Sequence, residues 1–205
     1  MHPKVLPAEG WAAVRTLVGA GTTDGFTLGG GTALALQLGH RASVDLDFFG
    51  EKPFDPAVLA LSLGRLGRVE VRGRSEGTLH ATLDGFRVTF LRAQAPLLFP
   101  GTPYRGLSLA DPRDIAVMKL VAIGGRGSRR DFVDLYFLLR GGVSLEDVFA
   151  WTRRRFREVD FNAYHLLRSL AFFDEAEEEP MPKLLKKASW AEIKKTIRAE
   201  VRRIS

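Results

Sequence analysis

The stretch FTLGGGTALALQLGHRASVDLDFFG, residues 26–50, combines a glycine turn with two aspartates that are one residue apart. Strand-like residues lead into the glycines, a helix-like run extends from Thr32 to Leu38, and a second strand carries Asp45 and Asp47. Alternate side chains of a strand point to the same face, so the two carboxylates are expected to project together. The apolar residues beside them are expected to face the core: Val44, Leu46 and Phe48.

Two carboxylates fixed side by side on an apolar strand repel each other unless a cation lies between them. Ligand sets that consist only of oxygen favour Mg²⁺ or Mn²⁺. The preceding glycines allow the backbone to approach a phosphate closely, and the amides at the start of the Thr32 helix offer hydrogen-bond donors and the positive end of a dipole. The sequence therefore predicts a divalent-metal site at Asp45 and Asp47, next to a phosphate site.

The composition is that of a globular protein. With 205 residues, of which 45% are hydrophobic, the chain has the size of one or two domains with a substantial core. No apolar run approaches the ~18–20 residues of a membrane span, and residues 1–11 lack the apolar segment of a signal peptide. The absence of cysteine excludes disulfides and thiolate metal sites, and the four histidines lack the spacing of zinc ligands. We therefore expect a cytoplasmic protein without a membrane segment.

The net charge of +6 belongs to the C-terminal tail. Residues 183–205 contain two glutamates and eight basic residues, so the remaining 182 residues sum to zero. The basic residues are Lys183, Lys186, Lys187, Lys194, Lys195, Arg198, Arg202 and Arg203. This pattern fits two interpretations: a solvated helix face, or a surface that contacts the phosphates of RNA through a salt-sensitive attraction.

Helix and strand signals surround the opening stretch. Asp55-Pro56 and Asp111-Pro112 each pair an N-cap acid with a proline suited to the first helical turn, and Asp84-Gly85 is a strong hairpin signal. A short basic loop, GGRGSRR, is expected between two of the helices. Helices are expected over residues 7–20, 55–66, 111–123 and 131–139, and strands over 68–74, 78–83 and 86–91.

The chain after Ser144 carries mainly helical signals. Asp160 is expected to cap one helix, and residues 175–179, an acidic run, are expected to form an exposed linker before Pro180. The last helix places apolar residues on one face: Trp190, Ile193, Ile197, Val201 and Ile204. We expect an α/β core over residues 1–110 and a helical region over 111–205 that packs against the core and completes the active site.

A glycine turn, a helix and then Asp-x-Asp on the next strand are typical of the polymerase-beta-like nucleotidyltransferase fold, an α/β fold with a mixed sheet. Thirteen residues, 32–44, separate the glycines from Asp45. More narrowly, GGTALALQLGHRASVDLDFF and DIAVMKLVAIGGRGSRRDFVDLYFLL resemble two blocks of the AbiEii/AbiGii-type nucleotidyltransferase toxins of type IV toxin–antitoxin systems. The matching residues are Arg41, Ser43, Asp45, Asp47, Phe48, Lys119, Arg130, Asp131, Asp134 and Tyr136.

The resemblance implies transfer of a nucleotidyl group from a nucleoside triphosphate to RNA, notably the tRNA 3′ end, by a toxin that a separate antitoxin restrains. Asp45 and Asp47 would bind Mg²⁺ or Mn²⁺, and Lys119 would bind the triphosphate as a point charge. Asp131 would act as a base or orient Lys119, with Asp134 one turn further on the same side. The remaining nucleotide-binding residues would be Gly30, Gly31, Thr32, Ser43 and Arg41, although Arg41 could instead pair with an aspartate.

One position departs from the wider fold, where a third carboxylate often lies on a later strand. Thr89 occupies the expected place in FRVTFL and cannot supply a charge. Either two carboxylates suffice, aided by Asp131, or activity is reduced.

Two other functions stay open: nucleotidyl transfer to a protein hydroxyl, and a catalytically silent module that binds nucleic acid through the basic tail. His40 is expected to be a loop residue.

Overall fold

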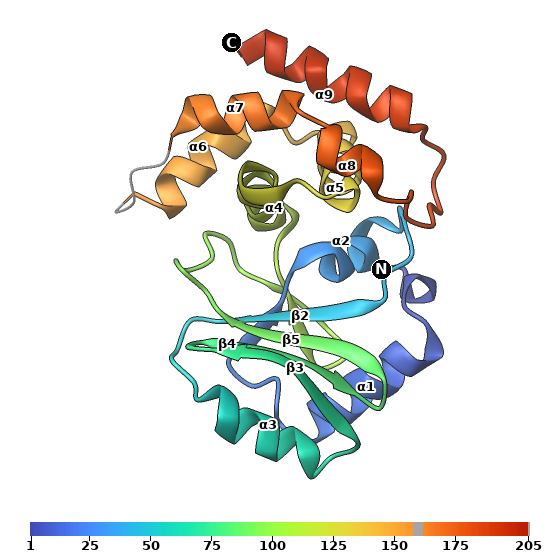
Figure 1. The fold of residues 1–205 in the computed structure, drawn as a ribbon, viewed down its shortest axis with the longest axis vertical. Coiled ribbons are helices and arrows are strands. Elements are labelled where there is room, and N and C mark those ends of the chain that lie inside the picture. Colours follow the sequence, from blue (N-terminus) through green and yellow to red (C-terminus); the bar gives the residue numbers. More distant parts are fainter. Residues whose placement is uncertain (158–161, 205) are drawn as a thin grey trace.

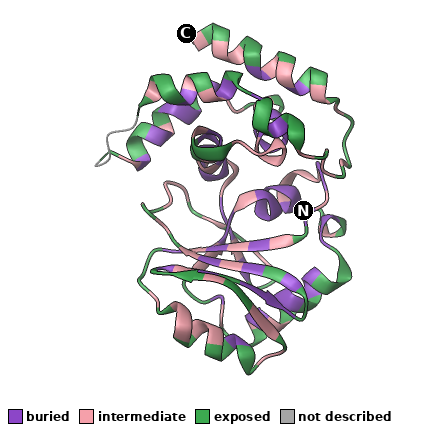
Figure 2. Ribbon diagram, viewed as in Figure 1, coloured by how far each residue is buried: buried purple, intermediate pink, exposed green. Residues whose placement is uncertain are grey.

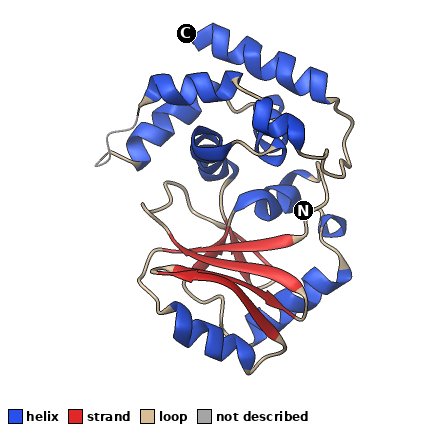
Figure 3. Ribbon diagram, in the orientation of Figure 1, coloured by secondary structure: helices blue, strands red, loops and turns tan. Residues whose placement is uncertain are grey.

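A seven-stranded mixed sheet forms the lower half of the molecule, and helices fill the upper half (Figures 1 and 3). This computed structural model describes residues 1–157 and 162–204. The strand order is β3-β4-β5-β2-β1-β7-β6, with β2 parallel to β5 and β1 parallel to β7. The strands are β1 (Phe26–Leu28), β2 (Asp45–Gly50), β3 (Val69–Ser75), β4 (Thr78–Leu83), β5 (Phe86–Arg92), β6 (Thr102–Tyr104) and β7 (Leu107–Leu109).

Helices cover the sheet from both sides. Helices α1 and α3 lie below it in the view of Figure 1, whereas α2 and the C-terminal helices lie above. The helical elements are η1 (Pro3–Val5), α1 (Ala8–Gly19), α2 (Gly30–Leu38), α3 (Pro56–Gly64), α4 (Pro112–Arg126), α5 (Arg129–Arg140), α6 (Leu145–Arg155), α7 (Ala163–Ala171), α8 (Asp174–Glu178) and α9 (Trp190–Ile204). Within the described ranges, none of them has the length and apolar character that crossing a bilayer requires.

Strand β2 runs through the middle of the sheet and alternates in burial. Leu46 and Phe48 are fully buried in the core, while Asp45 and Asp47 lie on the opposite, partly exposed face. The expectation that Val44 also faces the core is wrong: its side chain is half exposed. The reason is that the strand begins only at Asp45, so its alternation does not extend back to Val44.

The hairpin between β4 and β5 confirms the turn signal in the sequence. Asp84 and Gly85 both have positive φ angles, 50° and 83°, which is the backbone of a type I′ turn. A second hairpin of the same kind joins β6 to β7 through Arg105 and Gly106, with φ angles of 51° and 79°. The sequence did not predict this pair, because each strand has only three residues and β6 contains Pro103.

Two expectations for the helical half are wrong in part. The basic segment 124–130 is mostly helical, because α4 continues through Gly124 to Arg126. Glycine suits this position, since a Cβ atom on Gly124 would overlap the side chain of Leu166 on α7. The acidic run forms the short helix α8 rather than a linker, with Ala176 fully buried and Glu177 paired with Lys194. Asp160, the expected cap, lies outside the described residues; the side chain of Asn162 caps α7 instead.

The C-terminal half is tied to the loop that follows α2. An isolated bridge pairs Arg41 with Leu184, and the amide of Ala42 donates to the carbonyl of Lys183 at 2.9 Å. Helix α2 itself is buried along most of its length between the sheet and α4 (Figure 2). The residues that enclose the space above Asp45 and Asp47 are therefore held by both halves of the chain.

Candidate active site

The sheet and the helices face each other across a polar cavity of about 210 Å³. Strand β2 supplies the aspartates, the start of α2 supplies a glycine, and α4 and α5 supply the opposite wall. The lining residues are Gly31, Arg41, Asp45, Asp47, Lys119, Arg126, Ser128, Arg130 and Asp131. The structure therefore brings together six of the nine site residues expected from the sequence; Gly30, Thr32 and Ser43 are not among the lining residues.

Asp47 is a carboxylate whose charge is poorly compensated. Burial first and the adjacent charge of Asp45 second raise its pKa to about 6, while Lys119 and Thr89 act in the opposite direction. A positive φ of 60° at Gly30 places this backbone beside the carboxylate, where a Cβ atom would lie 2.9 Å from Oδ2 of Asp47. The glycine thus allows the start of α2 to approach Asp47 closely.

Asp45 faces two arginines from different elements. Its Oδ2 lies 3.4 Å from Nη1 of Arg130 on α5 and 3.5 Å from Nη2 of Arg87 on β5. All three side chains are partly exposed, so these ion pairs are screened by solvent and contribute little to stability. The arginines are free to turn toward a phosphate that enters the cavity.

Thr32 and Ser43 are buried supports rather than lining residues. Their hydroxyl oxygens lie 2.6 Å apart, and the Thr32 hydroxyl also donates to the backbone carbonyl of Asp45. The pair links the first turn of α2 to the start of β2 and fixes the position of Asp45. Their expected contact with nucleotide stays a prediction.

The opposite wall is held by Asp134, which is fully buried on α5. Arg41 binds its carboxylate with two hydrogen bonds, of 2.6 Å from Nε and 2.9 Å from Nη2. Nζ of Lys119 lies 2.8 Å from Oδ2 of Asp134 and 2.8 Å from Oδ1 of Asp131. Arg41 therefore makes the aspartate pair that the sequence left open, and a Cβ atom on Gly31 would overlap its guanidinium.

The charges of this cluster compensate one another. Burial alone would raise the pKa of Asp134, but Lys119 and Arg41 hold it well below its usual range. Burial alone would lower the pKa of Lys119, but Asp134 and Asp131 raise it above its usual value. His40 completes the cluster, with Nε2 2.7 Å from Oδ1 of Asp134, although burial lowers the pKa of this histidine. These ionic groups form a rigid unit behind the cavity.

Asp131 has both carboxylate oxygens engaged. Oδ1 accepts from Lys119, while Oδ2 accepts from the hydroxyl of Ser128 at 2.7 Å and from its amide at 3.2 Å. This reciprocal arrangement is a capping box at the start of α5. The geometry supports orientation of Lys119 by Asp131, one of the two roles considered for this residue.

The donor set at Asp45 and Asp47 fits a hard divalent cation. Its atoms are all oxygen, and a cation would relieve the repulsion that raises the pKa of Asp47. Within residues 1–157 and 162–204 no group of three or more His, Cys, Asp or Glu side chains is arranged to hold a metal ion. The ion would therefore complete its coordination with water and substrate phosphates, as magnesium commonly does.

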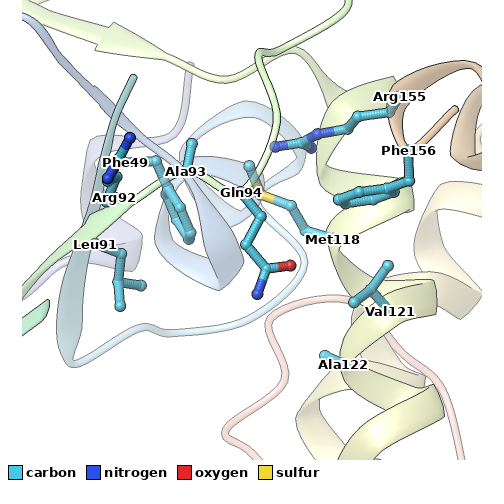
Figure 4. A pocket seen from close by; sticks show the side chains of 10 residues that line it. All are labelled: Phe49, Leu91, Arg92, Ala93, Gln94, Met118, Val121, Ala122, Arg155 and Phe156. Atoms are coloured by element: carbon cyan, nitrogen blue, oxygen red, sulfur yellow. The ribbon is translucent and has the colours of Figure 1, made fainter. Parts of the chain in front are cut away.

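A second, apolar cavity of about 330 Å³ is lined by residues of the same strand and helix, β2 and α4 (Figure 4). Phe49 follows Asp47 at the next position on that face of β2, and Met118 precedes Lys119 on α4. The cavity is lined by Phe49, Leu91, Arg92, Ala93, Gln94, Met118, Val121, Ala122, Arg155 and Phe156. A ligand with a charged end and a flat apolar end could occupy both cavities at once.

Several site residues were missed by sequence reasoning. His40 was expected in a loop but is completely buried beside Asp134, and Arg87 was not considered although the register places it directly beside Asp45. Arg126 was hidden in the segment expected to be a loop. For His40, the sequence GHR offered a signal, since a histidine and an arginine between a helix and a strand are well placed to contact a buried acid. Thr89 lies beside Asp47, where the sequence placed it.

Comparison with known proteins supports the same chemistry. The model of the nucleotidyl transferase AbiEii toxin family of type IV toxin–antitoxin systems matches residues 12–96 and 85–203. A protein of Aquifex aeolicus (strain VF5), aq_aa25, is 36% identical over 204 residues, with 96% of each chain covered. These matches extend over almost the whole chain, including its helical half.

Solved structures share the fold. MenT4, a nucleotidyltransferase toxin from Mycobacterium tuberculosis H37Rv, has a TM-score of 0.60 at 17% identity, with 93% of this chain and 80% of MenT4 covered. A candidate nucleotidyltransferase from H. pylori has a TM-score of 0.51 at 16% identity, with 95% and 96% covered. At these identities the likeness concerns architecture, which agrees with the expected mixed-sheet nucleotidyltransferase core.

Proposed function

This chain belongs to the AbiEii family of nucleotidyl transferase toxins of type IV toxin–antitoxin systems, and we propose that it transfers a nucleotidyl group from a nucleoside triphosphate to the 3′ end of an RNA, such as tRNA, in the cytoplasm. It is a nucleotidyltransferase with a polymerase-beta-like fold. The observation that carries the finer proposal is the convergence of Gly31, the aspartate pair of β2 and Lys119 on one cavity.

Each wall of the polar cavity has a distinct task in this proposal. The first amides of α2 and the ammonium of Lys119 hold the phosphates, and Arg130 supplies a further cation. Asp45 and Asp47 hold Mg²⁺ or Mn²⁺, which when bound polarises the α-phosphate and neutralises the departing pyrophosphate. Asp131 keeps Lys119 aimed at the cavity, at 2.8 Å.

The apolar cavity suits the nucleoside of the triphosphate. Its aromatic walls, Phe49 and Phe156, offer flat apolar surface to a base, and Gln94 reaches toward the space between them (Figure 4). Residues of β2 and α4 that are close in sequence line the two cavities, Asp47 and Phe49 on β2 and Met118 and Lys119 on α4, so the proposed nucleotide extends from one cavity toward the other. Arg155 closes the far side and pairs with the buried Asp114.

The basic face of α9 is the proposed contact for RNA. Part of its charge is neutralised within the chain, because Lys194 pairs with Glu177 and Arg203 pairs with Glu146. Other basic side chains of the tail are exposed: Lys183, Lys186, Lys187, Lys195, Arg198 and Arg202. Such a surface attracts the phosphate backbone without regard to sequence. A cognate antitoxin is the protein partner that the family implies.

The test offers the purified protein each labelled nucleoside triphosphate with Mg²⁺ or Mn²⁺, together with either tRNA or lysate protein. We expect label in tRNA, and growth arrest on expression, with both effects abolished by Asp45→Ala. Asp24→Ala, which removes an exposed aspartate far along the sequence from this pair, is the matched control and should behave like the wild type. Label in protein alone would overturn the RNA acceptor in favour of a protein hydroxyl.

The silent-module alternative predicts different results from the same preparation. It requires nucleic-acid binding that Asp45→Ala leaves unchanged, with no label transferred and no stabilisation by triphosphate and metal together. Growth arrest that disappears in Asp45→Ala would exclude this alternative. Wild-type expression without a growth defect would contradict the toxin role while leaving the transfer chemistry to be judged by the labelling result.

A further inference from the structure

A row of three side chains crosses the sheet from the aspartate pair to the outer strands. The register pairs Asp47 on β2 with Thr89 on β5, and Thr89 with His80 on β4. Residues paired directly across neighbouring strands present their side chains on one face of the sheet. Asp47 and Thr89 are partly exposed and His80 is exposed, so this row leads from the cavity to solvent.

The row suggests which nitrogen of His80 faces the aspartates. The register places Thr89 beside Asp47, and Thr89 lowers the pKa of that carboxylate, as a hydroxyl that donates to it does. Nδ1 of His80 lies 3.3 Å from the Thr89 hydroxyl oxygen. A hydroxyl that donates to Asp47 has its oxygen left to accept from His80, and in that arrangement Nδ1 carries the ring proton.

The other ring nitrogen is therefore a free base on the sheet face. Within residues 1–157 and 162–204, Nε2 of His80 has no hydrogen-bond partner. Resting on the function proposed above, we propose that His80 is the general base that accepts the proton of the acceptor hydroxyl, with Thr89 as the residue that positions it. The exposed face of β4 and β5 is then the acceptor site, and Arg87 binds a phosphate of the acceptor strand there.

The carboxylates of the cavity leave this role open. Both oxygens of Asp131 are occupied by Lys119 and Ser128, and Asp134 is buried among three partners. Asp45 and Asp47 are assigned to the cation. Thr89 stands where a third carboxylate would lie but cannot take up a proton at neutral pH, whereas an imidazole can. His80, whose Nδ1 lies 3.3 Å from the Thr89 hydroxyl, offers such an imidazole on the same sheet face.

The proposed step balances without a further reactant. A lone pair of the acceptor hydroxyl oxygen forms a bond to the α-phosphorus, and the bond from that phosphorus to the oxygen bridging the β-phosphate breaks. The electrons of the broken bond leave with pyrophosphate. The hydroxyl proton passes to Nε2 of His80, which becomes an imidazolium and then releases the proton to solvent.

The environment of His80 contains charges of both signs. The neighbouring strands carry Asp45 and Asp47 on β2, Arg87 on β5, and the ion-paired Glu70 and Arg72 on β3. Gly73, which pairs with His80 on β3, has no side chain to cover the ring. The imidazole is thus accessible to an acceptor that lies across the outer strands.

The test uses His80→Ala and His80→Gln in the full-length protein, assayed for label transfer over a range of pH. We expect kcat to fall about 100-fold or more, as for loss of a general base, with KM for the triphosphate unchanged. The dependence of kcat on pH should be weaker in both variants than in the wild type, and free imidazole should restore part of the rate to His80→Ala. Thr78→Ala, on the same face of β4, is the matched control and should retain wild-type kinetics.

Two outcomes would overturn the inference. One is an unchanged kcat in both His80 variants; the other is a lower kcat whose pH profile keeps the wild-type shape and does not respond to imidazole. Thermal stabilisation by triphosphate and Mg²⁺ is measured in parallel and should be the same in wild type and variants. A wild type without transfer to any acceptor would instead refute the proposed function, so the two failures are distinguishable.

Discussion

Asp134 and Asp47 lie on opposite walls of the same site and have opposite electrostatics. Asp134 is fully buried, yet Lys119 and Arg41 keep its pKa well below the usual range. Asp47 is less buried, yet its pKa is raised to about 6, first by burial and then by Asp45. A carboxylate whose charge is satisfied within the protein is available for structure only. A carboxylate whose charge is unsatisfied lowers the stability of the metal-free protein. Its oxygens have no strong partner within the protein, so they are available to bind a cation.

Removal of the unsatisfied carboxylate should have the largest effect on function and almost none on folding. We expect Asp47→Asn to reduce nucleotidyl transfer at least about 1,000-fold, equivalent to about 4 kcal/mol of transition-state stabilisation, because a metal ligand is lost. The melting temperature of the metal-free protein should stay equal or rise, since the repulsion with Asp45 disappears. Transfer of label and thermal melting of the same sample measure the two effects.

Asp24→Asn is the control for this substitution, because it removes an exposed carboxylate without touching the cavity. If Asp47→Asn lowered the melting temperature as much as Asp134→Asn does, the proposed difference in structural role between the two aspartates would be wrong. Full activity in Asp47→Asn would contradict the proposed metal site.

Removal of the satisfied carboxylate should destabilise the fold strongly. Asp134→Asn leaves Lys119 and Arg41 buried without their shared counter-charge, and breaking such a pair costs about 3–5 kcal/mol. For a chain of this size, a loss of that magnitude lowers the melting temperature by roughly 6–20 °C. Differential scanning calorimetry at pH 7 checks this value. An unchanged melting temperature would mean that the cluster does not support the wall.

The metal-free protein should lose stability as the pH rises from about 4 to 6. The folded pKa of Asp47 is above its unfolded value of 3.8, so the folded state binds more protons in this range and loses that advantage as the pH approaches 6. The full loss, up to about 3 kcal/mol, is reached above pH 6. Asp134 should contribute little slope in this range, because its folded pKa and its unfolded value of 3.8 both lie below it.

Melting curves in EDTA from pH 4 to 8, compared between wild type and Asp47→Asn, isolate this contribution. The variant should lack the loss between pH 4 and 6. Added Mg²⁺ or Mn²⁺ should stabilise the wild type more at pH 8 than at pH 5, since protons and cations compete for one carboxylate. Equal stabilisation at both pH values in wild type and variant would show that the ion binds elsewhere.

The two walls also differ in how far the sequence predicted them. The Asp-x-Asp strand, its glycine turn and the hairpin at Asp84-Gly85 are local patterns, and the structure has them where the sequence indicated. Val44 was assigned to the core because alternation was extended one residue beyond the start of β2. Local patterns therefore located the elements but not their ends.

The Asp134 cluster depends on contacts that local patterns do not contain. His40 and Arg41 meet Asp134 across 94 and 93 residues of sequence, so their partner could be known only once α2 and α5 had packed together. Similarly, the acidic run became helix α8 because Ala176 is buried and Glu179 accepts from the amide of Arg129, neither of which the composition of the run reveals. Long-range contacts decided both cases.

Substitutions in the hydroxyl pair behind Asp45, Thr32 and Ser43, should have the smallest effects, and they distinguish a structural role from contact with the substrate. Thr32→Val removes one hydroxyl and leaves that of Ser43 buried without its 2.6 Å partner, which should cost about 1–2 kcal/mol and lower transfer only severalfold. Ser43→Ala should cost less, because Thr32 keeps its hydrogen bond to the backbone carbonyl of Asp45. The double variant should cost less than the sum of the two, because each single variant already loses the contact between the two hydroxyls.

Urea unfolding of the four proteins, with transfer measured alongside, gives the coupling energy of the pair. Simple additivity would show that the hydroxyls act separately, and a loss of transfer as large as in Asp47→Asn would place Thr32 or Ser43 in contact with the substrate. Coupled stability with a small change in transfer would assign the pair to the support of Asp45. The satisfied groups of this site would then be structural on both walls, and the binding groups would be those that the fold leaves uncompensated.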